Sequence, residues 1–290
     1  MGANAVNKSE YKNIQIITSR QNPTVLYACK LAEKKHRMAE RKFRFDGIKL
    51  FEEAIGSGIV PELVLIKEGS FGRIIDALED QLKALEAANV RLISDDVFDK
   101  ISEEKAPEGI ICIAKHIDKF HKIIKIDNED LLVGKMIGDD DKVFALESIR
   151  DPGNLGTIIR SATAFGVDWV IISSDCAELY NPKTLRAAMG TLFKQKIIVT
   201  DDISATLKKL SLRGRKTYAA ALSDDAVLLG GFELSTKDCI VVGNEGHGLS
   251  DKTISACDQK LLIPMTENAE SLNAAIASSV CLWEQFGRNL

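Results

Sequence analysis

Three polar segments that contain glycine or asparagine stand in the C-terminal half of the chain, where hydrophobic, strand-like sequence gives way to helix-like sequence. They are NLGTIIRSATAFG at residues 154–166, GNEGHGLS at residues 243–250 and IPMTENAESLN at residues 263–273. The carboxyl ends of parallel strands meet at one edge of an open α/β sheet, and ligands bind at that edge. The three segments are therefore predicted to converge on one site.

Residues 143–290 alternate strand-like and helix-like sequence throughout. The strand-like stretches are VFALES, DWVIIS, QKIIVT, TYAAAL, CIVVGNE and KLLIPM, and the chain closes with a long helix-like segment. This alternation predicts an α/β domain whose mostly parallel sheet is covered on both faces.

Residues 1–117 are interpreted as a separate, small α/β domain. It combines the helix-like stretches KLAEKKHRMAERKF and KLFEEAIGSG, a helix over about residues 73–88, and the strands PELVLIK, VRLIS and GIICIAK. The pattern weakens over residues 118–142, which we interpret as a linker. The predicted order is thus a domain at 1–117, a linker at 118–142 and a domain at 143–290.

Charge is distributed unevenly along the chain. The net charge of −4 argues by itself against a nucleic-acid partner, yet the first 60 residues contain eleven Lys or Arg and six Asp or Glu. A basic cluster of this kind attracts phosphates, whereas the alternative is a solvated helix face with pairs such as Glu33 with Arg37. The candidate phosphate contacts are Lys34, Lys35, Arg37, Arg41 and Arg44.

Several classes of protein lack their signatures. The six cysteines form no C-x-x-C pair and the four histidines are dispersed, so we expect free thiols and no metal. No apolar run reaches the length of a membrane span and no secretory signal is visible, which predicts a cytoplasmic protein without a membrane partner. The absence of a GxGxxG fingerprint after a strand argues against a dinucleotide-dependent dehydrogenase.

The three C-terminal segments resemble the signature motifs of the SpoU (TrmH) family of RNA ribose 2′-O-methyltransferases. Softer resemblances, in ITSRQNPTV, FRFDGIKLFEEAI and KAPEGIICIAK, link the N-terminal domain to the RNA-binding domain of such enzymes, whose fold is shared with ribosomal proteins. The resemblance implies a trefoil-knotted methyltransferase domain, S-adenosylmethionine as cofactor, an RNA substrate and a homodimer. Because of this domain pairing, ribosomal RNA is preferred over transfer RNA as the substrate.

The resemblance also implies a role for individual residues. It makes the following residues catalytic: Asn154, Arg160, Glu245, Ser271 and Asn273. It places the cofactor against Leu222, Gly243, Asn244, Glu245, Ile263, Met265, Ser271, Leu272 and Asn273. It adds Lys183 and Arg186 as RNA contacts.

Each of these polar residues also has a simpler explanation. Asn154 is suited to cap a helix, as is one of Ser271 and Asn273, and Arg160 could be a surface cation. Glu245 lies in a turn bounded by glycines, where a carboxylate is not needed for packing, and this favours a functional role. A guanidinium stays protonated, so we interpret Arg160 as a charge stabiliser and leave the proton acceptor unassigned. His247 is interpreted as a variable turn residue.

Two alternatives to a ribosomal RNA methyltransferase remain at this level. One is a transfer RNA ribose 2′-O-methyltransferase, and the other is a non-catalytic RNA-binding or ribosome-assembly protein with the same fold. Retention of all five motif residues counts against the second. The sequence identifies neither the nucleotide modified nor whether the role is ribosome maturation or antibiotic resistance.

Overall fold

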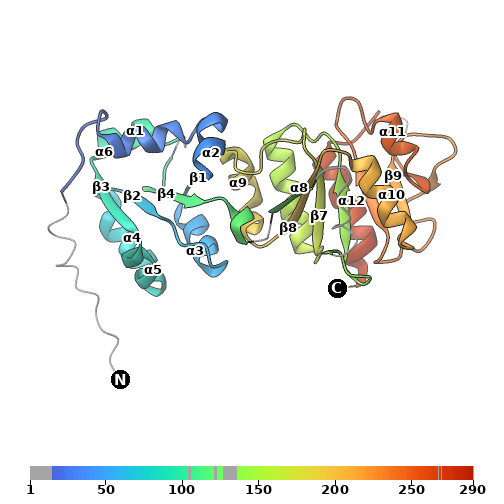
Figure 1. Cartoon of the computed structure of the whole chain (residues 1–290), viewed down its shortest axis with the longest axis horizontal. Coiled ribbons are helices and arrows are strands. Elements are labelled where there is room, and N and C mark those ends of the chain that lie inside the picture. The colour runs from blue at the N-terminus through green and yellow to red at the C-terminus, as the bar shows by residue number, and fades with distance from the viewer. Residues whose placement is uncertain are drawn as a thin grey trace, which may run out of the picture. The chain divides into compact units, whose positions relative to one another are not determined.

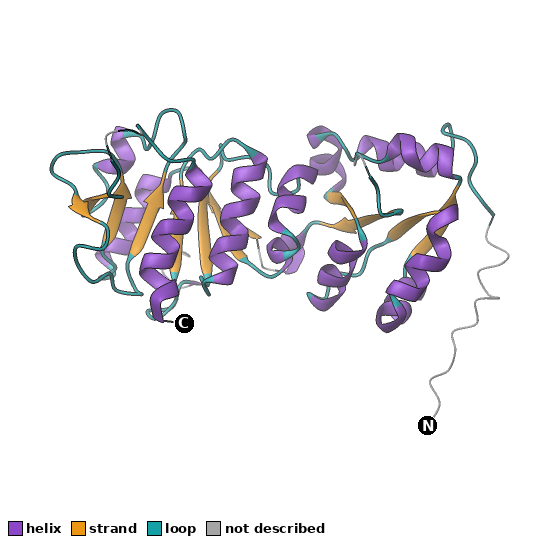
Figure 2. Cartoon of the chain, turned by 180° about the vertical axis from the view of Figure 1, so that it is seen from behind, coloured by secondary structure: helices purple, strands orange, loops and turns teal. Residues whose placement is uncertain are grey.

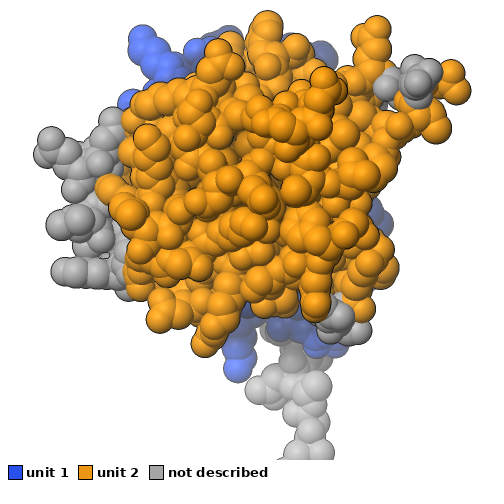
Figure 3. All heavy atoms as spheres, turned by 90° about the vertical axis from the view of Figure 1, so that its right-hand side faces the viewer, with its two compact units in different colours: residues 1–116 blue, residues 117–290 orange. Residues whose placement is uncertain are grey.

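A computed structural model describes residues 15–103, 106–120, 123–126, 136–266, 268 and 270–289. The chain divides into two compact units, residues 1–116 and residues 117–290, which Figure 3 distinguishes by colour. Each is an α/β unit, in agreement with the predicted fold class. Among the described helices, none combines the length and the apolar character that a membrane span requires.

The first unit is built on a four-stranded sheet in the order β1-β4-β2-β3 (Figure 1). The β4 strand runs antiparallel to both neighbours, and β2 runs parallel to β3. Its strands are β1 (Lys42–Asp46), β2 (Leu63–Lys67), β3 (Asn89–Ile93) and β4 (Ile110–Lys115). Its helices are α1 (Pro23–Lys30), α2 (Lys34–Glu40), α3 (Ile48–Gly56), α4 (Phe71–Ala77), α5 (Leu82–Ala87) and α6 (Asp95–Ile101).

The N-terminal helix prediction was wrong in its boundaries. The stretch KLAEKKHRMAERKF spans the end of α1, all of α2 and the start of β1, a strand that was not predicted. The α2 helix ends where Arg41 adopts a left-handed conformation with φ of 51°. The predicted helix over residues 73–88 is divided into α4 and α5 by a short 3-10 turn.

The second unit contains an eight-stranded sheet in the order β10-β12-β9-β11-β6-β7-β8-β5, and each of its pairings is parallel. Its strands are β5 (Ile123–Ile126), β6 (Val143–Leu146), β7 (Trp169–Ser173), β8 (Lys196–Thr200), β9 (Thr217–Ala220), β10 (Val227–Leu228), β11 (Cys239–Val242) and β12 (Gln259–Leu262). The edge strand β5 lies within the segment interpreted as a linker. Residues 127–135 of that segment lie outside the described residues.

Helices cover the central strands of this sheet, as Figure 2 shows. Every residue of β6, β7 and β11 is buried, as expected for parallel strands covered on both faces. The helices are α8 (Pro152–Ala164), α9 (Pro182–Ala188), α10 (Ile203–Leu212), α11 (Asp251–Ile254) and α12 (Ala274–Phe286). The α8 helix packs against both α9 and α12, and α10 packs against α11. The trefoil knot implied by the resemblance stays a prediction.

Gly156 explains how closely α8 approaches α9. A Cβ atom at this position would lie 2.4 Å from the Thr184 carbonyl oxygen and 2.7 Å from the Ala187 Cβ atom. On its other flank, α8 contacts α12 through a hydrogen bond of 3.0 Å between Ser161 and Ser279. The helix that carries Asn154 and Arg160 is thus held between two neighbours.

Candidate functional site

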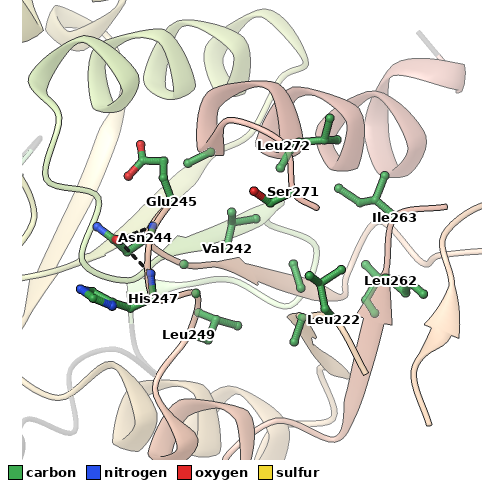
Figure 4. A pocket seen from close by; sticks show the side chains of 18 of the residues that line it. Leu222, Val242, Asn244, Glu245, His247, Leu249, Leu262, Ile263, Ser271 and Leu272 are labelled. Carbon is green, nitrogen blue, oxygen red and sulfur yellow. Dashed lines mark hydrogen bonds between the residues drawn. The ribbon is translucent and has the colours of Figure 1, made fainter. Parts of the chain in front are cut away.

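Two of the three polar segments, residues 243–250 and 263–273, line one pocket of about 510 Å³ in the second unit (Figure 4). The third, residues 154–166, is joined to both through hydrogen bonds of Asn154. The walls of the pocket come from the carboxyl ends of β9, β11 and β12 and from the start of α12, at the predicted edge of the sheet. The lining includes these residues of the predicted cofactor set: Leu222, Gly243, Asn244, Glu245, Ile263, Met265, Ser271 and Leu272. Asn273 is not among the lining residues, although its sequence neighbours Leu272 and Ala274 are.

The pocket combines apolar walls with backbone groups. Val242, Leu249 and Leu261 form part of its apolar lining, and Leu222 stands at the rim with 64% of its surface exposed. A ligand that covers a large apolar side chain this exposed lowers the free energy, because apolar surface is removed from water. The volume and lining suit a small organic ligand with an apolar or aromatic part.

The turn at residues 244–248 is fixed by its own hydrogen bonds. The Asn244 and Gly248 backbones exchange two of them, with N to O distances of 3.1 and 2.9 Å. Asn244 Oδ1 also accepts from the Gly246 N–H at 2.8 Å. Gly243 permits this compact path, because a Cβ atom there would lie 2.4 Å from the Gly248 carbonyl carbon.

Two residues that directly follow β6 and were not predicted as site residues anchor both ends of this segment. The buried Glu147 carboxylate accepts hydrogen bonds from the Ser250 N–H at 2.8 Å and from the Thr253 hydroxyl at 2.6 Å. The Ser148 carbonyl accepts from Asn244 Nδ2 at 2.9 Å. A carboxylate placed directly after a fully buried strand was the available signal for Glu147.

Asn154 does not cap α8, contrary to the simpler explanation for it. Asp151 is the N-cap, and its carboxylate accepts the Asn154 N–H at 2.9 Å. The Asn154 side chain is therefore available to donate from Nδ2 to Glu245 Oε1. On its other side, Asn154 Oδ1 accepts from Asn273 Nδ2 at 3.2 Å.

Asn273 does cap its helix, as the simpler explanation held. Its Oδ1 atom accepts from the Ala275 N–H at 2.9 Å and from the Ile276 N–H at 3.3 Å. This fixes the amide so that its Nδ2 points to Asn154. One hydrogen-bonded chain, Glu245 to Asn154 to Asn273, therefore joins all three motifs.

The remaining predicted catalytic residues are accessible. Arg160 is exposed on α8 and makes no hydrogen bond or ion pair with any residue that the structure describes. Ser271 lines the pocket and is exposed. The proposed RNA contact Lys183 pairs with Asp151 at 2.6 Å, which holds the pKa of that carboxyl below its usual range. Arg186 is half-buried on α9.

The predicted basic cluster divides into exposed and buried residues. Lys34, Lys35 and Arg41 are exposed. Arg37 is only 2% exposed and donates to the Leu31 and Ala32 carbonyl oxygens, at 2.8 and 2.5 Å.

Arg44 is equally buried and pairs with the Asp46 carboxylate at 2.8 Å. The prediction that Arg37 and Arg44 contact phosphates was therefore wrong. Both guanidinium groups satisfy acceptors inside the first unit, and periodicity alone could not separate them from their exposed neighbours.

The thiols of Cys281 and Cys176 lie in buried surroundings that disfavour the charged form. Burial raises the pKa of Cys281 to about 12 and that of Cys176 to about 11. All six cysteines are free. Among the described ranges, no group of three His, Cys, Asp or Glu side chains is placed to hold a metal ion.

The two units match two known families. Residues 141–283 match the SpoU rRNA Methylase family, and residues 22–112 match the MRM3-like substrate binding domain. The chain is 31% identical over 272 residues to the 23S rRNA (guanosine(2553)-2′-O)-methyltransferase RlmP of Bacillus subtilis, an alignment that covers 93% of this chain and 99% of that protein. It is 29% identical over 227 residues to the 23S rRNA (guanosine-2′-O-)-methyltransferase RlmB of Acinetobacter baylyi, covering 77% and 89%.

Solved structures resemble both units together. A crystal structure of an RNA 2′-O ribose methyltransferase has a TM-score of 0.77 and 27% identity, covering 95% of this chain and all of that one. The AdoMet-bound rRNA methyltransferase from Sinorhizobium meliloti has a TM-score of 0.76 and 25% identity, covering 95% and 98%.

Fold and site together define an α/β enzyme with a pocket at the carboxyl edge of its parallel sheet. The polar motifs at that edge and the matches to both units narrow this class further. The chain belongs to the SpoU rRNA methylase family. This confirms the resemblance and the RNA methyltransferase class that it implied.

Proposed function

We propose that this chain transfers a methyl group from S-adenosylmethionine to the 2′-hydroxyl of a guanosine in 23S ribosomal RNA. The observation that carries the proposal is the hydrogen-bonded chain from Glu245 through Asn154 to Asn273, which joins all three family motifs beside the pocket. Both bacterial relatives are named for this reaction on 23S guanosine, and the first aligns with nearly the whole chain. Transfer RNA is the alternative substrate.

The pocket at the edge of the sheet is proposed as the S-adenosylmethionine site. The exposed Leu222 at its rim and the apolar Ile263 and Leu272 would cover the adenosine part, while Gly243, Asn244 and Met265 offer backbone groups. The S. meliloti relative binds AdoMet, which supports this choice of ligand. Bound there, the cofactor supplies a methyl group on a positively charged sulfur.

The reaction requires the ribose 2′-oxygen to approach in line with the bond that breaks. The oxygen forms a bond to the methyl carbon, the carbon–sulfur bond breaks, and the hydroxyl proton must leave. Arg160 is proposed to stabilise negative charge on the attacking oxygen and the neighbouring phosphate, because its guanidinium is exposed and unpaired among the described residues. We leave the proton acceptor unassigned.

Asn154 and Glu245 are proposed to hold the ribose side of the site in place. Their mutual hydrogen bond fixes the orientation of both side chains before substrate arrives. Asn273 extends this support to α12, and Ser271 faces the pocket next to it. Such fixed polar groups need no reorganisation during the reaction.

Binding of RNA is proposed to use cations of both units, of which Arg186 is half-buried and the others are exposed. Lys34, Lys35 and Arg41 belong to the first unit, which matches a substrate-binding domain. Lys183 and Arg186 lie on α9 in the second, and Lys183 would exchange its ion pair with Asp151 for a phosphate. Each phosphate contact would add to the salt dependence of binding.

A homodimer is proposed from the outer face of α12. Ile276 and Trp283 on this face are 55% and 52% exposed, and Val280 lies between them in sequence. Residues spaced by three or four positions share one face of a helix, so these form an apolar stripe suited to burial against a second copy. We further propose a cytoplasmic location, where ribosomal RNA is available in bacteria.

The proposed reaction is tested by incubating the protein with tritium-labelled S-adenosylmethionine and unmodified 23S rRNA. Label in a 2′-O-methylguanosine supports the proposal. Label that appears only with transfer RNA would move the function to the alternative substrate. Binding of rRNA without any transfer would favour a non-catalytic assembly protein.

A further inference from the structure

His247 stands at the tip of the turn at residues 244–248, and its side chain is exposed. The His247 N–H donates to Asn244 Oδ1 at 3.3 Å, so the backbone beneath the imidazole is tied to the same side chain that orders the turn. The imidazole itself makes no hydrogen bond or ion pair with any described residue. The turn therefore presents an aromatic ring on a rigid base without using it for internal packing.

The imidazole projects from the same side of the turn as the catalytic carboxylate. Figure 4 shows the side chains of Glu245 and His247 directed away from Leu222 and Ile263, although all four residues contribute to the lining of the pocket. Glu245 reaches Asn154 on α8 from this side. Asn154 and Glu245 are the residues proposed to hold the ribose. The nucleotide that carries this ribose would then lie on the same side of the turn as the His247 imidazole.

An exposed aromatic ring beside a nucleotide has a specific use in RNA recognition. Bases that leave the RNA stack lose stacking on their neighbours. They commonly stack instead on aromatic side chains, including histidine. We propose that His247 stacks on the base of the nucleotide whose ribose is methylated. This inference rests on the proposed function and adds a substrate-binding residue to it.

The test compares three His247 variants of the full chain on 23S rRNA transcribed in vitro. His247→Ala removes the ring and should lower kcat/KM for the rRNA by roughly 10-fold, the scale of one lost base stack. His247→Phe keeps a flat ring and should stay within about threefold of the wild type. His247→Lys offers a cation without a ring and should behave like the alanine variant.

Cofactor binding separates this role from a defect in the pocket. His247 is among the residues that line the pocket, but its imidazole points away from Leu222 and Ile263. The dissociation constant for S-adenosylmethionine without RNA should therefore be the same for the wild type and His247→Ala. Leu212→Ala is the matched control, because it removes an exposed side chain at the end of α10. It should match the wild type in both measurements.

Three results would overturn the inference. Wild-type kinetics in His247→Ala would show that the ring has no role, and weaker cofactor binding with an unchanged KM for rRNA would assign it to the pocket. Recovery by lysine but not by phenylalanine would identify a phosphate contact instead of a stack. If the wild type methylates no rRNA, the proposed function and the inference both fail. If the wild type and His247→Ala are equally active, only the inference fails.

Discussion

Asn154 donates a hydrogen bond from its side-chain amide to the carboxylate of Glu245, a residue 91 positions away in the sequence. The direction of this bond is fixed, because Asn154 Oδ1 accepts from Asn273 on its other side. The pair therefore places one donor against one acceptor in the middle of the site.

Exchanging the amide and the carboxylate between positions 154 and 245 should show whether the site needs the hydrogen bond itself or these particular residues. Asn154→Asp places two carboxylates together and should reduce turnover by about 100-fold, since like charges at this distance repel. Glu245→Gln added to it restores one donor and one acceptor, so the double variant should be faster than Asn154→Asp alone. Single-turnover methyl transfer at saturating RNA and cofactor measures both. A double variant slower than either single variant would contradict this role.

S-adenosylmethionine should stabilise the native protein without a metal. At a concentration of 100 times its dissociation constant, a ligand that binds only the native state adds about 2.7 kcal/mol to the free energy of unfolding. Thermal unfolding with and without cofactor measures this, and a chelator should change nothing. An absent shift at saturation, or one that a chelator removes, would count against the proposed pocket.

Gly243 and Gly246 should differ sharply when each is changed to alanine. A Cβ atom at Gly243 would meet the backbone of Gly248 and Leu249 at 2.4 to 2.5 Å, whereas at Gly246 it meets only Asn244 Oδ1, at 3.4 Å. We expect Gly243→Ala to lower the melting temperature and abolish the cofactor-induced shift, while Gly246→Ala keeps the fold. Equal melting temperatures for the two variants would show that the turn relaxes freely.

The exposed cations and the buried arginines of the basic cluster should respond differently to substitution. Changing Lys34, Lys35 and Arg41 to alanine should lower RNA affinity and flatten its salt dependence by about one unit of slope per lost contact. Arg37→Ala should instead lower the free energy of unfolding by about 2 kcal/mol, because two backbone carbonyls lose their donor. Filter binding across salt concentrations and urea unfolding measure the two effects. An unchanged slope in the triple variant would mean a merely solvated face.

Asp151 links stability to pH through its ion pair with Lys183. The pKa of this carboxyl is lowered, first by the hydrogen bond from Lys183 and also by the Asn154 N–H, so its stabilising contribution is complete above the ordinary aspartate pKa of about 3.9. It is lost as the pH falls through the lower, folded-state value. The difference in unfolding free energy between the wild type and Asp151→Asn should hold from pH 7 to about pH 4 and narrow below it. A difference that grows on acidification would contradict this sign; Asp224→Asn, at an exposed turn, is the control.

Sequence patterns predicted the parallel sheet and the convergence of the three motifs because both follow from local periodicity and from the direction of parallel strands. The burial of Arg37 and Arg44 was not predicted, because the spacing of charges does not show that their guanidinium groups bond to Leu31, Ala32 and Asp46 instead of facing solvent.

The bond between Asn154 and Glu245 was hidden for a related reason. From the sequence Asn154 was suited to cap α8, but Asp151 is the N-cap and leaves the Asn154 side chain to bond with Glu245. Glu147 was not predicted as a site residue, because its partners Ser250 and Thr253 lie more than a hundred residues away in the sequence.

Arg160 should contribute to chemistry more than to binding. Arg160→Ala should lower turnover by at least about 100-fold, the scale of one lost electrostatic contact in a transition state, with cofactor affinity retained. Arg160→Lys keeps the charge but loses the planar fork and should recover only part of the rate. Near-normal single-turnover rates in Arg160→Ala would leave a surface arginine without a role.

The most direct test of the account is the chemical position of the transferred methyl group. Tritium from labelled S-adenosylmethionine is followed into 23S rRNA from a strain that lacks this protein, and the RNA is then hydrolysed with alkali. A 2′-O-methyl group blocks cleavage at the following phosphate, so the account predicts the label in an alkali-resistant dinucleotide that contains guanosine. Label in mononucleotides would place the methyl group on a base and would contradict ribose methylation by this chain.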